Sequence, residues 1–361
     1  MDGAGGILVL ASTLRVGGGE RVLARLLIAL KDRGIPVSLL LLKEPGPVGH
    51  ELAAAGIPTR ALGLRSTRHP RAPLAILNVL RRSGARLLYV QDHHDCLFWG
   101  RLSAALAGFV PVLSPVHSSA QGDLRAFRGY NRLLLGLSPH LATLGPWQEA
   151  ALREREGLDP GFWVRIPNPV DGERFRPGAP REGGGPTVIG TVAALRQEKR
   201  QDLLLELAAR LAERRKIDLW LVGDGPEADA LRRRAEDLGI GGRVRFWGRR
   251  DDVPALLARM DLFVLTSAEE ALPLSVLEAL ASGVPVAAPP HGALPDLLAG
   301  GGGLLLTGGD PAVWAGQVDA FLAAPPARAE REAKARAIAA AHDPDRFADR
   351  YARLAAHLGA P

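Results

Sequence analysis

Short apolar runs alternate with amphipathic stretches along the chain, and this alternation predicts a repeated strand–helix fold. Apolar runs of this length, each followed by a segment of helical period, are typical of parallel strands that are buried on both faces. The predicted strands are 7–11, 36–42, 86–90, 187–193, 218–223, 243–248 and 261–267. The predicted helices are 20–33, 73–80, 97–107, 200–215, 226–238, 252–259, 273–282 and 346–358.

The strand–helix series occurs twice, on either side of a segment rich in proline and glycine (167–186, PNPVDGERFRPGAPREGGGP). We therefore predict an α/β fold with two Rossmann-like domains facing a cleft. The predicted organisation is an N-terminal domain 1–167, a linker 168–185, a C-terminal domain 186–340 and a final helical segment 341–361. That last helix is expected to cross back to the first domain. Ligands of doubly wound sheets bind beyond the carboxyl ends of the strands, so the cleft is the predicted site.

Composition narrows the class of protein. The chain has 361 residues, of which 47% are hydrophobic and 23% charged, as in soluble globular proteins. A single cysteine, Cys96, excludes an internal disulfide framework and fits a reducing compartment. No apolar run approaches the ~20 residues of a membrane span, and residues 5–11 read as a first strand rather than a signal peptide. We expect a cytoplasmic protein.

The charge is unevenly distributed. Residues 1–180 hold 22 lysines and arginines against 14 aspartates and glutamates, whereas residues 181–361 hold 23 against 25. A basic half favours an anionic partner, although an arginine-rich composition alone would also produce it. Arginine clusters flank the predicted helix 73–80. We therefore add, as an expectation, peripheral binding of the first half to an anionic membrane surface, on the inner face of the cell membrane.

Segment 266–283 (TSAEEALPLSVLEALASG) carries the most specific chemistry. Glu270 follows a predicted strand, Pro273 opens a helix, and Glu278 lies within that helix. The free amides at the helix start, around Leu274 and Ser275, form a potential anion site. One segment thus offers a place for a diphosphate with a carboxylate on either side. A solvated helix face and a loop acid would be the simpler interpretation of the two glutamates.

The wider pattern resembles the retaining GT-B glycosyltransferases of family 4, the group with a Glu-x7-Glu motif. The matching segments occur in the family's order. They are GGGERVLARL (17–26), PVHSS (115–119), IPNPVDGERFRP (166–177), GTVAALRQEKRQDLLL (190–205), LVGDGP (221–226), RVRFWGRRDDVPALL (243–257), EALPLSVLEALASGVPV (270–286) and HGALPDLL (291–298). The likeness is close over the second half and looser over the first.

The resemblance implies three residues at the reaction centre. Glu270 would contact the transferred sugar and Lys199 the diphosphate, while His117 would line the acceptor side. A lysine at an ordinary helix start and a hydrogen-bonded loop histidine are the plainer alternatives.

The resemblance also implies a set of nucleotide-sugar contacts. Glu278 would bind the ribose, the stretch Trp247–Asp252 would meet the base through backbone groups, and the Gly18–Gly19 turn would approach the diphosphate. The full set is Gly18, Gly19, Arg196, Gly223, Trp247, Asp252, Leu274, Ser275 and Glu278. No metal and no cofactor are expected, because lysine, arginine and helix amides neutralise the diphosphate in this family.

Two positions depart from the family pattern. The arginine usually found five residues before the lysine is Ala194, and we expect Arg196 or Arg15 to replace it. The glycine that usually follows the first glutamate is Ala271. Both departures leave open a weak or altered enzyme.

Other site types fit the sequence poorly. His93, His94 and Asp95 are adjacent and cannot all face one metal ion. GDGP (223–226) and GGGE (17–20) lack the three spaced glycines of a dinucleotide fingerprint. Aromatic residues are too sparse for a nucleic-acid surface.

We therefore expect a retaining glycosyltransferase that moves a sugar from a nucleotide-sugar, a UDP-sugar in preference to GDP-mannose, to a glycan or lipid-linked acceptor. Cell-envelope or polysaccharide biosynthesis is the expected setting. A nucleotide-sugar epimerase on the same fold and a non-catalytic glycosyltransferase-like subunit are the alternatives.

Overall fold

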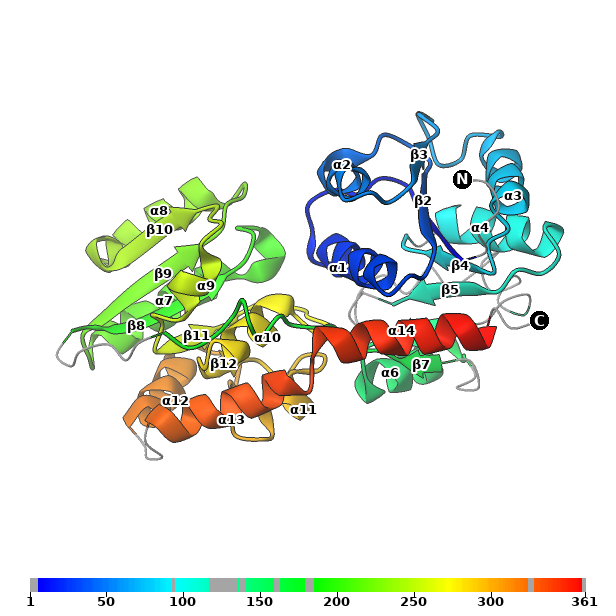
Figure 1. Ribbon diagram of the computed structural model, residues 1–361. Coiled ribbons are helices and arrows are strands. Elements are labelled where there is room, and N and C mark those ends of the chain that lie inside the picture. Colours follow the sequence, from blue (N-terminus) through cyan, green and yellow to red (C-terminus); the bar gives the residue numbers. More distant parts are fainter. Residues whose placement is uncertain are drawn as a thin grey trace. The chain divides into compact units, whose positions relative to one another are not determined.

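A computed structural model describes residues 6–92, 95–116, 136, 140–158, 163–178, 185–323 and 328–358 of the chain. It divides into two compact units, drawn with their elements in Figure 1. The first unit comprises residues 1–168 and 344–361, and the second comprises residues 169–343. The chain therefore passes between the units twice.

The first unit is built on a seven-stranded sheet in the order β3-β2-β1-β4-β5-β6-β7, and the pairs are parallel. Its strands are β1 (Ile7–Ala11), β2 (Val37–Leu41), β3 (Thr59–Ala61), β4 (Leu87–Val90), β5 (Val112–Pro115), β6 (His140–Thr143) and β7 (Trp163–Arg165). Its helices are α1 (Gly18–Asp32), α2 (Gly46–Ala54), α3 (Ala72–Ser83), α4 (Asp95–Leu106), α6 (Pro146–Glu156) and α14 (Pro344–Leu358).

The second unit has a six-stranded parallel sheet in the order β10-β9-β8-β11-β12-β13. Its strands are β8 (Thr187–Val192), β9 (Ile217–Val222), β10 (Val244–Gly248), β11 (Leu262–Val264), β12 (Val286–Ala288) and β13 (Gly303–Leu305). Its helices are α7 (Gln201–Ala212), α8 (Ala228–Asp237), α9 (Val253–Leu257), α10 (Leu274–Ala281), α11 (Leu294–Leu298), α12 (Pro311–Ala323) and α13 (Arg328–Ala340), with short 3-10 turns η4 (Gln197–Lys199) and η5 (Gly241–Arg243).

Apolar runs became central strands because both of their faces are covered. All five residues of β1 are buried, and β1 pairs with β2 on one side and β4 on the other. A strand in that position has no polar face to present to water, so its sequence is apolar throughout rather than alternating. The predicted two-domain α/β fold of Rossmann type is thus confirmed, and the predicted strands are present.

The last helix returns to the first unit, as the sequence predicted. Arg33, just after α1, pairs with Asp345 at 2.6 Å and with Asp349 at 3.2 Å. Tyr351 is 5% exposed and its ring lies 6.0 Å from the ring of Tyr89 on β4. The helix therefore completes the core of a sheet that begins more than 300 residues earlier.

The stretch expected to be a linker packs on the second unit over its described part. Phe175 is 2% exposed, and the Val170 amide donates to the His342 carbonyl at 2.8 Å. A Cβ on Gly178 would lie 3.1 Å from the Cβ of Ala258. These contacts fix residues 169–178 to the second unit rather than leaving them as a free tether.

Candidate active site

Strand order brings two loops of the second unit together. β8 and β11 are neighbours in the sheet, although β9 and β10 come between them in sequence, on the other side of β8. This is the switch point of a doubly wound sheet, where loops leave adjacent strands in opposite directions and create room for a ligand. The loop after β8 carries Lys199, and the loop after β11 carries Glu270.

Hydrogen bonds tie the two loops to each other. The Thr266 hydroxyl donates to the Arg200 carbonyl at 2.8 Å, and the Ala268 amide donates to the Glu198 carbonyl at 3.0 Å. Arg200 itself has φ +49°, a left-handed conformation that ends η4 and starts α7. The loops thus form one backbone-linked ledge at the carboxyl edge of the sheet.

Lys199 and Glu270 form an ion pair on this ledge. Lys199 Nζ donates to Glu270 Oε1 at 2.7 Å, with the lysine side chain 28% exposed and the glutamate side chain 10% exposed. Sequence reasoning gave the two residues separate ligand contacts, but the structure joins them directly. A carboxylate that has lost most of its water needs such a partner, because an uncompensated buried charge is costly.

The start of α10 lies directly after Glu270. Pro273 is the N-cap residue in extended conformation, and no side chain caps the helix. The first intrahelical bond runs from the Leu277 amide to the Pro273 carbonyl, so the amides of the first turn, including those of Leu274 and Ser275, have no acceptor within the helix. Glu278 is half-buried one turn further along. A helix start whose first amides have no acceptor within the helix therefore adjoins the ion pair.

Two glycines allow close backbone approach around the ledge. A Cβ on Gly223, which has φ +136°, would lie 2.0 Å from the Ala193 carbonyl oxygen. A Cβ on Gly292, which has φ +55°, would lie 2.2 Å from the Glu270 carbonyl oxygen and 2.4 Å from that of Ala271. Gly223 thus holds the ends of β8 and β9 together. Gly292 supports the loop that carries Glu270.

Arg250 and Asp252 form an ion pair within the stretch Trp247–Asp252, which was predicted to bind the base. Arg250 bonds both carboxylate oxygens of Asp252, at 2.7 Å and 2.8 Å, and the hydrogen bonds lower the pKa of Asp252. The guanidinium also lies 5.6 Å from the centre of the Trp247 ring, which meets the Trp220 ring edge-on at 5.2 Å. The Asp252 carboxylate is therefore paired within its own loop.

The two departures from the family pattern have different structural consequences. Ala194 is exposed, so the position of the usual arginine is open to solvent. Arg196 is 61% exposed, and its Nη1 lies 3.9 Å from Glu198. Ala271 fits without strain, because Phe109 and Arg200 are the non-glycine residues with positive φ in the described part of the chain.

The predicted residues of the first unit are placed only in part. Gly18 and Gly19 form the first turn of α1, after Gly17 as the N-cap residue, rather than a loop before the helix. His117 lies outside the described residues, as do His93 and His94. Asp95 accepts a hydrogen bond from the Thr67 hydroxyl at 2.8 Å and pairs with Arg68.

Sequence reasoning missed several supporting residues. Thr266 carries no motif signal, because any small polar residue after a strand looks the same. Asp92 lies at the switch point of the first unit, where its carboxylate accepts a hydrogen bond from the Ser12 amide. Only the strand order reveals that position. Gly292 lies in the HGALPDLL segment, but the sequence does not show that its backbone approaches the Glu270 carbonyl.

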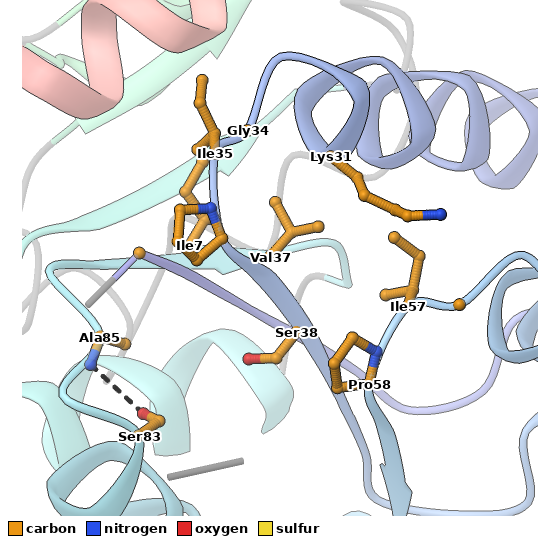
Figure 2. Close-up of a pocket in the computed structure, with 13 residues that line it drawn as sticks. Ile7, Lys31, Gly34, Ile35, Val37, Ser38, Ile57, Pro58, Ser83 and Ala85 are labelled. Carbon is orange, nitrogen blue, oxygen red and sulfur yellow. Dashed lines mark hydrogen bonds between the residues drawn. The ribbon is translucent and has the colours of Figure 1, made fainter. Parts of the chain in front are cut away.

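A separate hollow of about 480 Å³ lies in the first unit, at the edge of the sheet where the amino ends of the strands lie (Figure 2). Ile7, Ile35, Val37 and Ile57 form its apolar wall, and Lys31 stands at its side. The lining residues are at the amino ends of β1 and β2. This is the edge away from the switch point, so the hollow is not part of the candidate active site.

Groups of histidine, cysteine, aspartate and glutamate that could hold a metal ion are absent from the part of the chain that the structure describes. Over the same residues, every helix is too short or too polar to span a membrane.

Family comparisons cover both halves of the chain. Residues 174–338 match the model described as glycosyl transferases group 1, and residues 16–174 match the model described as glycosyltransferase family 4. Each half of the chain thus matches a glycosyltransferase model, and the two matches together span residues 16–338. The boundary between the two matches falls within the proline- and glycine-rich stretch.

Individual relatives match the chain over limited lengths. A lipopolysaccharide core biosynthesis glycosyltransferase, LpsE of Rhizobium meliloti, is 42% identical over 99 residues, which are 27% of this chain and 28% of the relative. An Escherichia coli UDP-Gal:alpha-D-GlcNAc-diphosphoundecaprenol alpha-1,3-galactosyltransferase is 24% identical over 68% of this chain and 69% of its own. Five of the matched relatives, LpsE included, are covered over only 28% to 43% of their own lengths.

Among solved structures, Anabaena HepE in complex with UDP superposes with a TM-score of 0.82. The superposition covers 97% of this chain and 99% of HepE, at 22% sequence identity. At that identity the likeness establishes the GT-B fold.

Proposed function

We propose that this protein is a retaining glycosyltransferase whose nucleotide-sugar donor binds the second unit at its switch point. The observation that carries the proposal is the Lys199–Glu270 ion pair beside the uncapped start of α10. It combines a cation, a carboxylate and a row of backbone amides within one ledge. That combination suits a ligand with a diphosphate next to a sugar.

The ion pair would reorganise when donor binds. The diphosphate competes with Glu270 for Lys199, and the amides around Leu274 and Ser275 take up further phosphate oxygens. Glu270 is then free to accept hydrogen bonds from sugar hydroxyls. Glu278 would accept those of the ribose, and the backbone of Trp247–Asp252 would meet the base. Gly18, Gly19 and His117 are proposed to serve the same reaction from the first unit.

In the proposed reaction the bond between the anomeric carbon and the diphosphate oxygen breaks, and an acceptor hydroxyl attacks the same face of the sugar. The acceptor proton passes to the departing phosphate, and the nucleoside diphosphate leaves. Negative charge develops on that leaving group, where Lys199 and the helix amides are preorganised to stabilise it. We propose that Lys199 and the helix amides stabilise the leaving diphosphate in place of a metal ion.

UDP is the proposed nucleotide. The Anabaena structure contains UDP, and the Escherichia coli relative is named for a UDP-Gal donor and a diphosphoundecaprenol-linked acceptor. LpsE is named for lipopolysaccharide core biosynthesis. We accordingly propose a glycan or lipid-linked acceptor in envelope polysaccharide synthesis, in a cytoplasmic protein.

Titration calorimetry with UDP and with uridine separates the proposed roles. Lys199→Ala should weaken UDP binding but not uridine binding, and should lower turnover by ~10²–10³. Glu278→Ala should weaken both ligands by ~1–3 kcal/mol, because the ribose is common to them. Glu270→Gln should slow transfer with UDP affinity nearly intact, since UDP has no transferred sugar.

Two variants are matched controls in the same unit. Lys216→Ala removes an exposed lysine, and Glu206→Gln breaks the exposed ion pair of Glu206 with Arg234 at 2.8 Å. Both should behave like the parent. If Lys199→Ala and Glu278→Ala also bind and turn over like the parent, the donor site lies elsewhere.

The products decide between the proposed reaction and its rivals. Anomeric proton coupling in the product should show the same configuration as the donor. Release of an epimerised sugar without any acceptor would indicate an epimerase. UDP binding without transfer to any of a panel of acceptors would indicate a non-catalytic subunit.

A further inference from the structure

Exposed apolar side chains gather on one part of the first unit. Among the large hydrophobic residues of the described chain, the three most exposed are Phe109 at 69%, Leu74 at 67% and Leu106 at 56%. Leu74 lies on α3, Leu106 ends α4, and Phe109 follows in the next turn. A large apolar side chain that stays in water does not contribute the stabilisation that its burial would give.

The two helices that carry these side chains lie side by side (Figure 1). The Ser103 hydroxyl on α4 donates to the Pro73 carbonyl at 3.1 Å, next to Leu74. Arg81 Nη2 on α3 donates to the Leu106 carbonyl at 3.0 Å. The contacts at both places put Leu74 and Leu106 on one continuous surface.

Phe109 is held in an unusual conformation. Its φ is +62°, directly after Gly108 at +105°. This conformation closes the end of α4, because the Phe109 amide donates to the Ala105 carbonyl at 3.3 Å and the Val110 amide to the Ala104 carbonyl at 3.1 Å. It leaves the phenylalanine side chain in water. Glycine is the usual residue at a left-handed helix end, so the phenylalanine adds exposed apolar surface that the cap itself does not require.

The same region is strongly basic. Residues 52–91 contain seven arginines and no aspartate or glutamate, and residues 96–122 contain one arginine and no acid. Arg71, Arg81 and Arg82 are exposed and share the outer stripe of α3 with Leu74, at helical spacing. An apolar centre ringed by arginines is complementary to an anionic lipid surface.

We propose that this face is a peripheral docking site for an anionic phospholipid bilayer. The α3–α4 patch consists of Arg71, Leu74, Arg81, Arg82, Leu106 and Phe109. Its apolar side chains would enter the acyl boundary, and its arginines would meet lipid phosphates. The proposal goes beyond the donor chemistry, because binding to vesicles requires neither nucleotide nor acceptor.

Vesicle co-sedimentation at low and high salt tests the patch. The parent should bind phosphatidylcholine vesicles that contain phosphatidylglycerol, bind pure phosphatidylcholine weakly, and release as salt rises. Leu74→Ser with Phe109→Ser should weaken binding by ~10-fold or more, from the lost apolar burial. Arg71→Gln with Arg82→Gln should cost about fivefold per arginine.

Matched controls lie on the second unit. Val313→Ser removes a side chain that is 46% exposed, and Arg233→Gln with Arg336→Gln removes two exposed arginines. These should sediment like the parent. All variants should keep the parent's melting temperature and its UDP affinity, so that a folding defect or a failed donor site is recognised separately.

Three results would overturn the proposal. The first is equal binding of the parent to anionic and neutral vesicles. The second is vesicle binding that survives in the Leu74→Ser, Phe109→Ser double variant, because charge alone would then explain it. The third is tighter binding of single-stranded nucleic acid than of vesicles, with the apolar substitutions having no effect, which would identify the patch as a polyanion surface.

Discussion

Lys199 and Glu270 show how two partly buried charges stabilise each other at the level of single residues. Each charge is partly buried, at 28% and 10% exposure, and each would be costly alone. Paired at 2.7 Å, they neutralise each other without a ligand. In our proposal the pair opens when donor binds, because a diphosphate offers Lys199 more negative charge than one carboxylate. The Lys199–Glu270 ion pair therefore stabilises the loops and, in our proposal, keeps both side chains in position to bind the donor.

Arg196 is the residue of the second unit that we propose to compensate for Ala194. It follows two residues later on the same ledge, and its side chain is 61% exposed and therefore able to reorient. Arg196→Ala should weaken UDP binding by ~1–3 kcal/mol, the range for a charged hydrogen bond. Calorimetry of the variant beside Arg233→Ala, an exposed arginine on α8, measures the effect.

The converse substitution sharpens this prediction. Ala194 is exposed, so Ala194→Arg has room for its side chain and should tighten UDP binding. Unchanged affinity in both Arg196→Ala and Ala194→Arg would mean that neither position faces the diphosphate. Arg15 of the first unit would then be the remaining candidate.

At the scale of elements, the site depends on loops whose backbones touch. Gly292 precedes α11, and its Cα approaches the carbonyl groups of Glu270 and Ala271. The Ala293 amide also donates to the Ala271 carbonyl at 2.9 Å. The position of Glu270 is thus set by a segment about twenty residues further along the chain, through contacts that only a glycine permits.

Gly292→Ala should disturb that loop. The new Cβ would lie 2.2 Å from the Glu270 carbonyl oxygen, at φ +55°, so the loop must move. We expect a loss of ~1–2 kcal/mol of unfolding free energy from the conformation alone, together with slowed sugar transfer. Gly239→Ala is the control, since Gly239 has φ +69° and a Cβ added there would meet no atom within 4 Å. Equal turnover in both variants would show that Gly292 does not position Glu270.

For the whole molecule, the closing helix makes the first unit discontinuous in sequence. α14 is joined to α1 by the Arg33 ion pairs and is buried against β4 through Tyr351. Burial raises the pKa of Tyr351, consistent with a phenol that has left water. The stability of the first unit therefore depends on the closing segment of the chain, residues 344–361.

Tyr351→Ala should destabilise the first unit by ~3–5 kcal/mol, the usual cost of deleting a buried aromatic ring. UDP binding at temperatures below the new transition should stay as in the parent, because the proposed donor site belongs to the second unit. Thermal melts and calorimetry, with the exposed Arg350→Ala as control, measure both effects. Loss of UDP binding in the folded variant would contradict a donor site that is held mainly by the second unit.

Sequence by itself determined the parts of this protein that depend on local pattern. Apolar runs such as 7–11 and 187–193 could be read as strands because a strand buried on both faces must be apolar. The Glu270–Glu278 segment could be read as a helix start between two carboxylates because Pro273 fixes where α10 begins. The last helix was also expected to return to the first unit, and it does so in the structure.

Tertiary structure alone decided which distant residues meet. Strand order places β8 beside β11, and from this follow the Lys199–Glu270 pair, the Thr266 hydrogen bond and the support from Gly292. The exposure of Leu74, Leu106 and Phe109 was equally hidden, since an apolar residue in a sequence looks buried until its surroundings are known. The local sequence pattern specifies helices and strands because their formation depends mainly on residues that are close in the chain. Sites and surfaces arise from contacts between elements, and those depend on the packing of the whole sheet.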